Sequence, residues 1–106
     1  MSLEVTNKNF EELINTEGKV VLVDFWAEWC SSCLMLNPII EQLSDDYVDE
    51  ALIGKVNAEK NEELSSKLGV RNLPTMLIFK DGDLVDRIVG AKPKDEIKSK
   101  IDSYIT

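Results

Sequence analysis

The sequence of 106 residues contains no histidine, only two cysteines and no long apolar run. Without histidine, Ser–His and Cys–His catalysis and every metal site that needs an imidazole are excluded. No apolar run approaches the roughly 20 residues that span a bilayer, so we expect no membrane partner. Two cysteines are too few for a small scaffold held together by disulfides, which normally carries four or more.

Positive charge is also scarce, with 12 Lys and Arg against 20 Asp and Glu. The net charge of −8 argues against a nucleic-acid partner, because phosphate backbones are bound by clustered cations. With 43% hydrophobic and 30% charged residues, the chain is typical of one globular domain covering residues 1–106. Its start has no basic segment followed by an apolar one. This favours a cytoplasmic location, and a periplasmic one stays open if a signal was removed.

The first half of the chain predicts a helix, a strand and a second helix. Thr6 is the expected N-cap of the first helix, which Gly18 ends. Residues 20–26 are apolar at both alternating positions, which is typical of a central strand covered on both faces. From Ser32 to about Tyr47 the apolar spacing is helical, and Pro38 inside this helix predicts a kink.

The second half predicts a strand, a short helix, a hairpin and a last helix. A short buried strand covers residues 52–56, and the helix after it stops at Gly69. Residues 75–79 and 84–89 flank a turn and form an antiparallel hairpin. The last helix begins near Pro93. With an additional edge strand at residues 3–5, this order predicts an α/β fold, a mixed sheet with helices on both faces.

The two cysteines are three residues apart, in Cys30-Ser31-Ser32-Cys33, directly after the central strand. A bond between them would close a loop too short to restrain the unfolded chain, so redox chemistry explains the pair better than stability does. At the start of a helix, the free N–H groups and the helix dipole stabilise the Cys30 thiolate, which makes Cys30 the attacking sulfur. Cys33, one turn further, is shielded and resolves the mixed disulfide. Two buried free thiols, or half of a metal site completed by other ligands, are the alternatives.

Asp24 is a lone carboxyl group inside the apolar central strand. Burial of such a group is costly unless it is paired, hydrated or protonated. By alternation it lies on the face of the helix that carries Cys33, where it could exchange a proton with that thiol. Lys55, inside the next strand, is its natural charge partner. A solvent-facing Asp24 and a surface Lys55 are the alternatives.

These segments resemble the thioredoxin family along essentially the whole chain. The resemblance rests on residues 23–30, Cys33, Pro38, residues 55–57, residues 73–75, residues 79–82 and residues 89–91. It implies the thioredoxin fold, a central mixed five-stranded sheet flanked by four helices. It also implies a monomeric protein-disulfide reductase with an exposed nucleophile Cys30, a resolving Cys33, and Asp24 with Lys55 as the proton-handling pair.

The resemblance further implies how the site binds substrates and receives electrons. It implies a cis peptide bond before Pro74 and a substrate-binding surface around the cysteines. The surface residues are Trp26, Trp29, Ser31, Ser32, Leu73, Pro74, Gly90 and Ala91. No bound cofactor or metal is implied besides the redox-active Cys30–Cys33 disulfide. Electrons would come from NADPH through thioredoxin reductase.

Two features depart from the family pattern. Ser31-Ser32 replaces the usual Gly-Pro, and Leu34 replaces the usual Lys or Arg. Without proline, position 32 regains an N–H that could stabilise the Cys30 thiolate, whereas the lost cation at position 34 acts the other way. Because position 34 is expected to be exposed and screened, we hypothesise a more oxidising couple than a Gly-Pro thioredoxin has. A disulfide oxidant or isomerase, and a binding module with an idle cysteine pair, are the competing functions.

Overall fold

Five strands form one mixed sheet in the computed structural model, which describes residues 1–105. In chain order they are β1 (Leu3–Glu4), β2 (Val20–Trp26), β3 (Ala51–Asn57), β4 (Thr75–Lys80) and β5 (Asp83–Val89). Their order across the sheet is β1-β3-β2-β4-β5, with β1, β3 and β2 parallel and with β4 antiparallel to both β2 and β5. Residues 20–26, which have apolar side chains on both faces, therefore form the central strand, as predicted.

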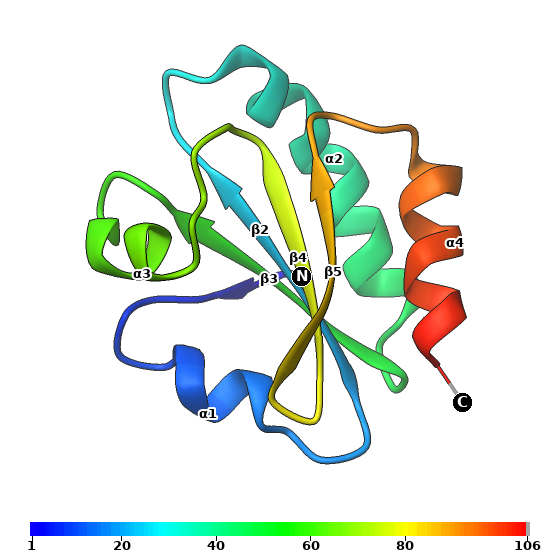
Figure 1. The fold of residues 1–106 in the computed structure, drawn as a ribbon. Coiled ribbons are helices and arrows are strands. Elements are labelled where there is room, and N and C mark those ends of the chain that lie inside the picture. The colour runs from blue at the N-terminus through cyan, green and yellow to red at the C-terminus, as the bar shows by residue number, and fades with distance from the viewer. Residues whose placement is uncertain (106) are drawn as a thin grey trace.

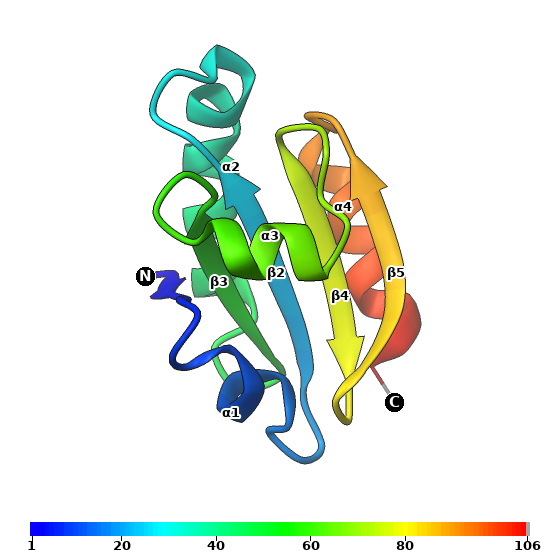
Figure 2. The same cartoon turned by 60° about the vertical axis from the view of Figure 1, so that its left-hand side comes forward.

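Four helices cover the two faces of this sheet (Figures 1 and 2). They are α1 (Phe10–Ile14), α2 (Ser31–Asp46), α3 (Glu62–Lys67) and α4 (Lys94–Tyr104). Helices α2 and α4 lie on one face, and α1 and α3 lie on the other. None of the helices within residues 1–105 is long and apolar enough to cross a membrane.

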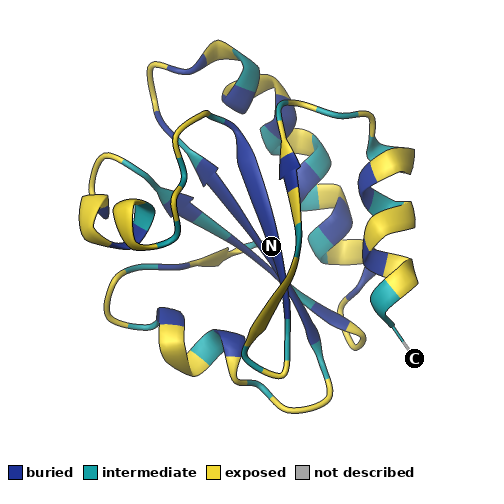
Figure 3. Ribbon diagram, in the orientation of Figure 1, coloured by how far each residue is buried: buried dark blue, intermediate teal, exposed yellow. Residues whose placement is uncertain are grey.

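Alternation along β2 divides the core into two clusters. Leu22 packs with Ile40 of α2 and Ile97 of α4, whereas Val23 packs with Phe10 of α1 and Leu64 of α3. Figure 3 shows the strands of the sheet interior buried and the outward faces of the helices exposed. Asp24 is next to Val23 on β2, so it shares the α2 face of the sheet with Leu22, as predicted from the alternation.

The predicted hairpin is present and its turn chemistry explains it. Asp81 and Gly82 have φ values of 52° and 87°, the left-handed backbone that a two-residue hairpin turn requires. Asp tolerates this region better than most side chains and glycine adopts it freely. The turn therefore sets the antiparallel pairing of β4 with β5, and Leu73 and Pro74 precede β4 at the opposite end of the hairpin.

The first helix begins later than its predicted cap. Thr6 is the N-cap expected from the sequence, but α1 starts at Phe10 and its N-cap is Asn9. The Asn9 side chain accepts a hydrogen bond from the Thr6 N–H at 2.8 Å, and the Thr6 hydroxyl accepts one from the Lys8 N–H at 3.2 Å. These local bonds keep residues 6–9 in a turn. The helix also ends at Ile14, so Gly18 belongs to the turn before β2.

Candidate active site

The two cysteines lie where the carboxyl end of β2 meets the first turn of α2. Cys30 is the N-cap of α2, with extended backbone angles (φ −91°, ψ 101°), and its carbonyl accepts the first helical hydrogen bond from the Leu34 N–H. Cys33 lies one turn into the helix and forms a disulfide with Cys30 across a Cα–Cα distance of 5.2 Å. The predicted pairing is thus present, and it places Cys30 at the positive end of a 16-residue helix.

Two donors point at the sulfur of Cys30. The Cys33 N–H donates to it at 3.3 Å, and the Ser32 hydroxyl lies 3.4 Å from it. Because a sulfur in a disulfide carries no proton, the Ser32 hydroxyl is the donor in that contact. From the sequence, the absence of proline at position 32 predicts that the backbone N–H of Ser32 donates to the Cys30 sulfur. The side-chain hydroxyl of that residue makes the contact instead.

The disulfide is embedded in a small apolar cluster. Buried Ala27 packs with both cysteines, and half-buried Trp26 and Leu73 close the cluster. Cys33 is fully buried and Cys30 is 6% exposed. The resemblance implies an exposed Cys30. In the structure, packing against Trp26 and Leu73 leaves only a small part of Cys30 accessible to solvent. That part still makes Cys30 the more accessible of the two sulfurs.

The loop before β4 forms one wall of this cluster. The peptide bond between Leu73 and Pro74 is cis, as the resemblance implies. The Pro74 carbonyl accepts a hydrogen bond from the Gly90 N–H at 2.8 Å, and the Thr75 hydroxyl donates to the Asn72 carbonyl at 2.6 Å. These bonds fix the loop that carries Leu73, which packs on the disulfide, and tie Pro74 to the end of β5.

The predicted surface residues that do not belong to this cluster include Trp29, Ser31, Gly90 and Ala91. Trp29 is 69% exposed and precedes Cys30 directly. Ser31 and Ala91 are exposed, whereas Gly90 is half-buried. The structure thus packs Trp26 and Leu73 against the cysteines and leaves Trp29 projecting into solvent.

Asp24 is fully buried, and neither of its carboxyl oxygens has a hydrogen-bond partner among residues 1–105. Burial raises the pKa of this carboxyl from 3.8 to about 8, although the ammonium of Lys55 lowers it in part. The alternative of a solvent-facing Asp24 is therefore wrong. A buried acid with a pKa near that of a thiol can take up or release a proton at neutral pH.

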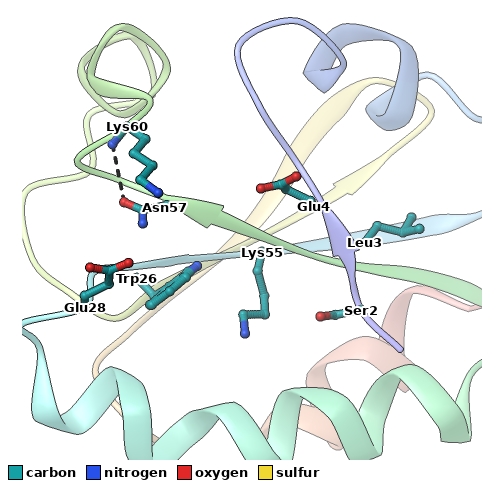
Figure 4. Close-up of a pocket in the computed structure, with 8 residues that line it drawn as sticks. All are labelled: Ser2, Leu3, Glu4, Trp26, Glu28, Lys55, Asn57 and Lys60. Carbon is teal, nitrogen blue, oxygen red and sulfur yellow. Dashed lines mark hydrogen bonds between the residues drawn. The ribbon is translucent and has the colours of Figure 1, made fainter.

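Lys55 is the register partner of Asp24 on β3, but its ammonium forms no ion pair with that carboxyl. The Nζ atom lies 5.0 Å from the centre of the Trp26 ring and 3.9 Å from a carboxylate oxygen of Glu41 on α2. Figure 4 shows the side chain extending from β3 toward α2, between Trp26 and Ser2. Lys55 therefore acts on Asp24 through its charge at a distance.

Glu41 and Ser2 also belong to this surrounding network, and reasoning from the sequence missed both. The Ser2 N–H and hydroxyl donate to the two carboxylate oxygens of Glu41 at 2.8 and 2.6 Å. Glu41 follows buried Ile40, so it lies at the border of the helix face that packs on the sheet. That border position was the available signal, but using it requires knowing that α2 lies beside Lys55.

No group of three or more Cys, Asp or Glu side chains within residues 1–105 is arranged to hold a metal ion. The chemistry that the described residues offer is that of a disulfide at a helix N-terminus, together with a buried carboxyl group on the strand that leads to it. Such a site can exchange electrons with another disulfide while protons move to and from the protein.

Comparisons with known proteins agree with this geometry. The family model described as Thioredoxin matches residues 1–103. A thioredoxin of Chlorobaculum thiosulfatiphilum is 52% identical over 96% of this chain and 94% of that protein. Thioredoxin 2 of Chlorobaculum tepidum is 48% identical over the same shares. The solved structure of a mutant thioredoxin from Halobacterium salinarum superposes with a TM-score of 0.91 at 35% identity, covering 99% of this chain and 91% of that one.

Thioredoxins carry their redox chemistry on a cysteine pair of the protein itself and need no bound cofactor. The described pair, its helix N-terminus and the matches along nearly the whole chain all agree. This chain belongs to the thioredoxin family and is a thiol–disulfide oxidoreductase that reduces protein disulfides with Cys30 and Cys33 as its redox pair.

Proposed function

We propose that Cys30 is the nucleophile and Cys33 the resolving thiol of this reductase. In the reduced protein the Cys30 thiolate attacks one sulfur of a substrate disulfide. The substrate S–S bond breaks, one substrate sulfur leaves as a thiolate, and a mixed disulfide joins Cys30 to the other. The observation that carries this assignment is the position of Cys30 at the N-cap of α2, with two donors on its sulfur and with more exposure than Cys33.

Asp24 takes the proton that Cys33 must lose in the second step. The Cys33 thiolate then attacks the Cys30 sulfur, the mixed disulfide breaks, and the second substrate thiolate leaves. The products are the Cys30–Cys33 disulfide and a substrate dithiol, so two electrons have passed to the substrate. Support comes from the burial of Asp24 on the α2 side of β2 and from its raised pKa of about 8.

The substrate-binding surface in this proposal is the wall made by Leu73 and Pro74 together with Trp26 and Trp29. Leu73 already packs on the disulfide, and Trp29 offers a large exposed aromatic face. Ser31 and Ser32 complete this surface at the start of α2, and Gly90 and Ala91 complete it after β5. An extended substrate segment along this wall would present its disulfide to Cys30.

Thioredoxins work with thioredoxin reductase and with disulfide-containing proteins. We propose the same supply here, with electrons passing from NADPH through that flavoprotein to the Cys30–Cys33 disulfide. A couple kept reduced in this way belongs in a reducing compartment, so the proposal includes the cytoplasm as its location and a monomer as the working form.

Trapping of the mixed disulfide with insulin as substrate tests the two cysteine roles. The Cys33→Ser variant lacks the resolving thiol, so its Cys30 should remain bound to an insulin chain and give a new band on a non-reducing gel. Cys30→Ser should give little or none of this product. Equal trapping by the two variants, or more by Cys30→Ser, would show that Cys33 attacks first and would overturn the assignment.

The Ser32 hydroxyl favours a more oxidising couple within the same chemistry. A thiolate accepts a hydrogen bond more strongly than a disulfide sulfur does, so this donor stabilises the reduced form. Ser32→Ala removes the hydroxyl and keeps the backbone N–H. We expect its reduction potential in glutathione buffers to be about 30 mV more negative than that of the wild type, the equivalent of one hydrogen bond to a charged group.

Ser31→Ala is the matched control, because Ser31 is exposed and makes none of the hydrogen bonds to the Cys30 sulfur. Its potential should equal that of the wild type. Ser31→Gly/Ser32→Pro, which restores the common dipeptide, should also be more negative. A wild-type potential equal to or below that of Ser32→Ala would contradict the role of the hydroxyl.

A further inference from the structure

The ammonium of Lys55 is the charged group beside the buried carboxyl of Asp24, and its position decides how strongly it acts there. The Lys55 side chain is only 19% exposed, yet it lines an open cavity of about 260 Å³ together with Trp26 and Ser2 (Figure 4). A flexible side chain beside such a space is not held by packing alone. Its position therefore depends on the charged and aromatic groups that it contacts.

Two contacts hold the ammonium away from Asp24. One is the face of Trp26, 5.0 Å from Nζ, and the other is the Glu41 carboxylate at 3.9 Å. Both Asp24 and Lys55 lie on the α2 side of neighbouring parallel strands, so rotation of the Lys55 side chain could bring the two charges together. In the structure this does not happen, and both oxygens of Asp24 lack a hydrogen-bond partner within residues 1–105.

Glu41 is itself held by the start of the chain. The Ser2 hydroxyl and N–H bind its two oxygens at 2.6 and 2.8 Å, which leaves the carboxylate little freedom to turn. These hydrogen bonds, first that of the hydroxyl, lower the pKa of Glu41, so it stays anionic at neutral pH. Ser2 comes directly before β1, so the N-terminal strand and α2 together orient the carboxylate that faces Lys55.

We propose that Glu41 is a positioning residue that holds the Lys55 ammonium on Trp26 and away from Asp24, and that Ser2 holds Glu41 in place. The consequence is a buried carboxyl group whose pKa stays near that of a thiol, since a direct ion pair with Lys55 would lower this pKa and leave the carboxylate a weaker base. This deepens the proposed proton transfer and rests on it for its importance in turnover. The geometry itself does not depend on the reaction.

Among the groups around the carboxyls of Asp24 and Glu41, Lys55 is the one through which the charge of Glu41 acts on Asp24. Opposite Asp24 on β4 lies the uncharged Met76, and α2 and α4 present apolar side chains such as Ile40 and Ile97 to this face. Glu41 faces Lys55 and, more distantly, the N-terminal ammonium, which pairs with Asp45 at 3.2 Å. The charge of Glu41 thus reaches Asp24 chiefly through the place that it gives to Lys55.

The test is the pKa of Asp24, followed by NMR of its carboxyl carbon in the oxidised full-length protein. Glu41→Gln removes the anion that competes for Lys55, so the ammonium can approach Asp24. We expect the pKa of Asp24 to fall by about 0.5 to 1 pH unit, the size of one charge interaction at partly buried distances. Ser2→Ala should lower it by a smaller amount.

The control on the same helix is Asp46→Asn, whose carboxylate pairs with Lys94 at 3.0 Å, and it should leave the pKa of Asp24 unchanged. In a Lys55→Gln background, Glu41→Gln should lose at least half of its effect. An unchanged pKa in Glu41→Gln overturns the proposal, and so does a shift that is equal with and without Lys55. Insulin reduction by Asp24→Asn, measured separately, tells whether Asp24 serves in turnover. Failure of that role is therefore distinguishable from failure of the positioning.

Discussion

Replacing Asp24 by Asn is expected to stabilise the protein strongly at alkaline pH and hardly at all in acid. In the folded protein, burial raises the pKa of Asp24 from 3.8 to about 8. Between these two values the unfolded chain loses a proton that the folded protein keeps, so wild-type stability falls as pH rises through this range and is constant above it. Asn has no proton to lose and escapes this loss.

The expected gain above about pH 9 is on the order of 5 kcal/mol, because each pH unit between the two pKa values is worth about 1.4 kcal/mol. Urea unfolding of the oxidised proteins across this pH range measures it. Asp49→Asn, at an exposed aspartate after α2, is the matched control and should follow the wild-type curve. A constant difference between Asp24→Asn and wild type at all pH values would contradict the burial of an acid with a raised pKa.

Much of the fold could be predicted because its elements are marked by local patterns. Residues 20–26 have apolar side chains on both faces and form the central strand. Asp81 and Gly82 set the hairpin turn. The start of the first helix could not be predicted, because the Asn9 side chain takes the Thr6 N–H and moves the helix start to Phe10. That start rests on a few hydrogen bonds, and the alternatives differ by little free energy.

The redox pair of the site was predictable for a similar reason. A Cys-X-X-Cys segment between a buried strand and a run with helical apolar spacing places the first sulfur at a helix N-terminus. The cis peptide bond before Pro74 was not predictable from the residue itself, since only about one X–Pro bond in twenty is cis. It followed from the resemblance to thioredoxins.

The surroundings of the site needed the three-dimensional arrangement. Lys55 is the partner that the sequence predicts for Asp24, and the two are register neighbours, but the position of α2 gives Lys55 a nearer anion in Glu41. Likewise, the replaced proline suggests a new N–H near Cys30, whereas the rotamer of Ser32 brings its hydroxyl to the sulfur. Which of several competing partners a side chain contacts depends on distances of a few ångströms. The spacing of residues in the sequence does not predict it.

Loss of the Cys30 sulfur should have the largest effect of any single substitution on activity. Cys30 is the sulfur with exposure, with two hydrogen-bond donors and with the helix N-terminus, and Cys33 is fully buried beneath it. A serine hydroxyl in its place is not a thiolate at neutral pH and cannot attack a disulfide. Cys33 alone lacks the accessibility to replace it. Unfolding of Cys30→Ser should match that of the reduced wild-type protein, so that lost activity reflects chemistry.

The reduction of insulin by dithiothreitol, followed by turbidity, tests the central claim most directly. The wild-type protein should accelerate precipitation of the insulin chains well above the rate with dithiothreitol alone, and Cys30→Ser should show only that uncatalysed rate. A Cys30→Ser variant as active as the wild type, or a wild-type protein no faster than dithiothreitol alone, would contradict a reductase that works through the Cys30 thiolate.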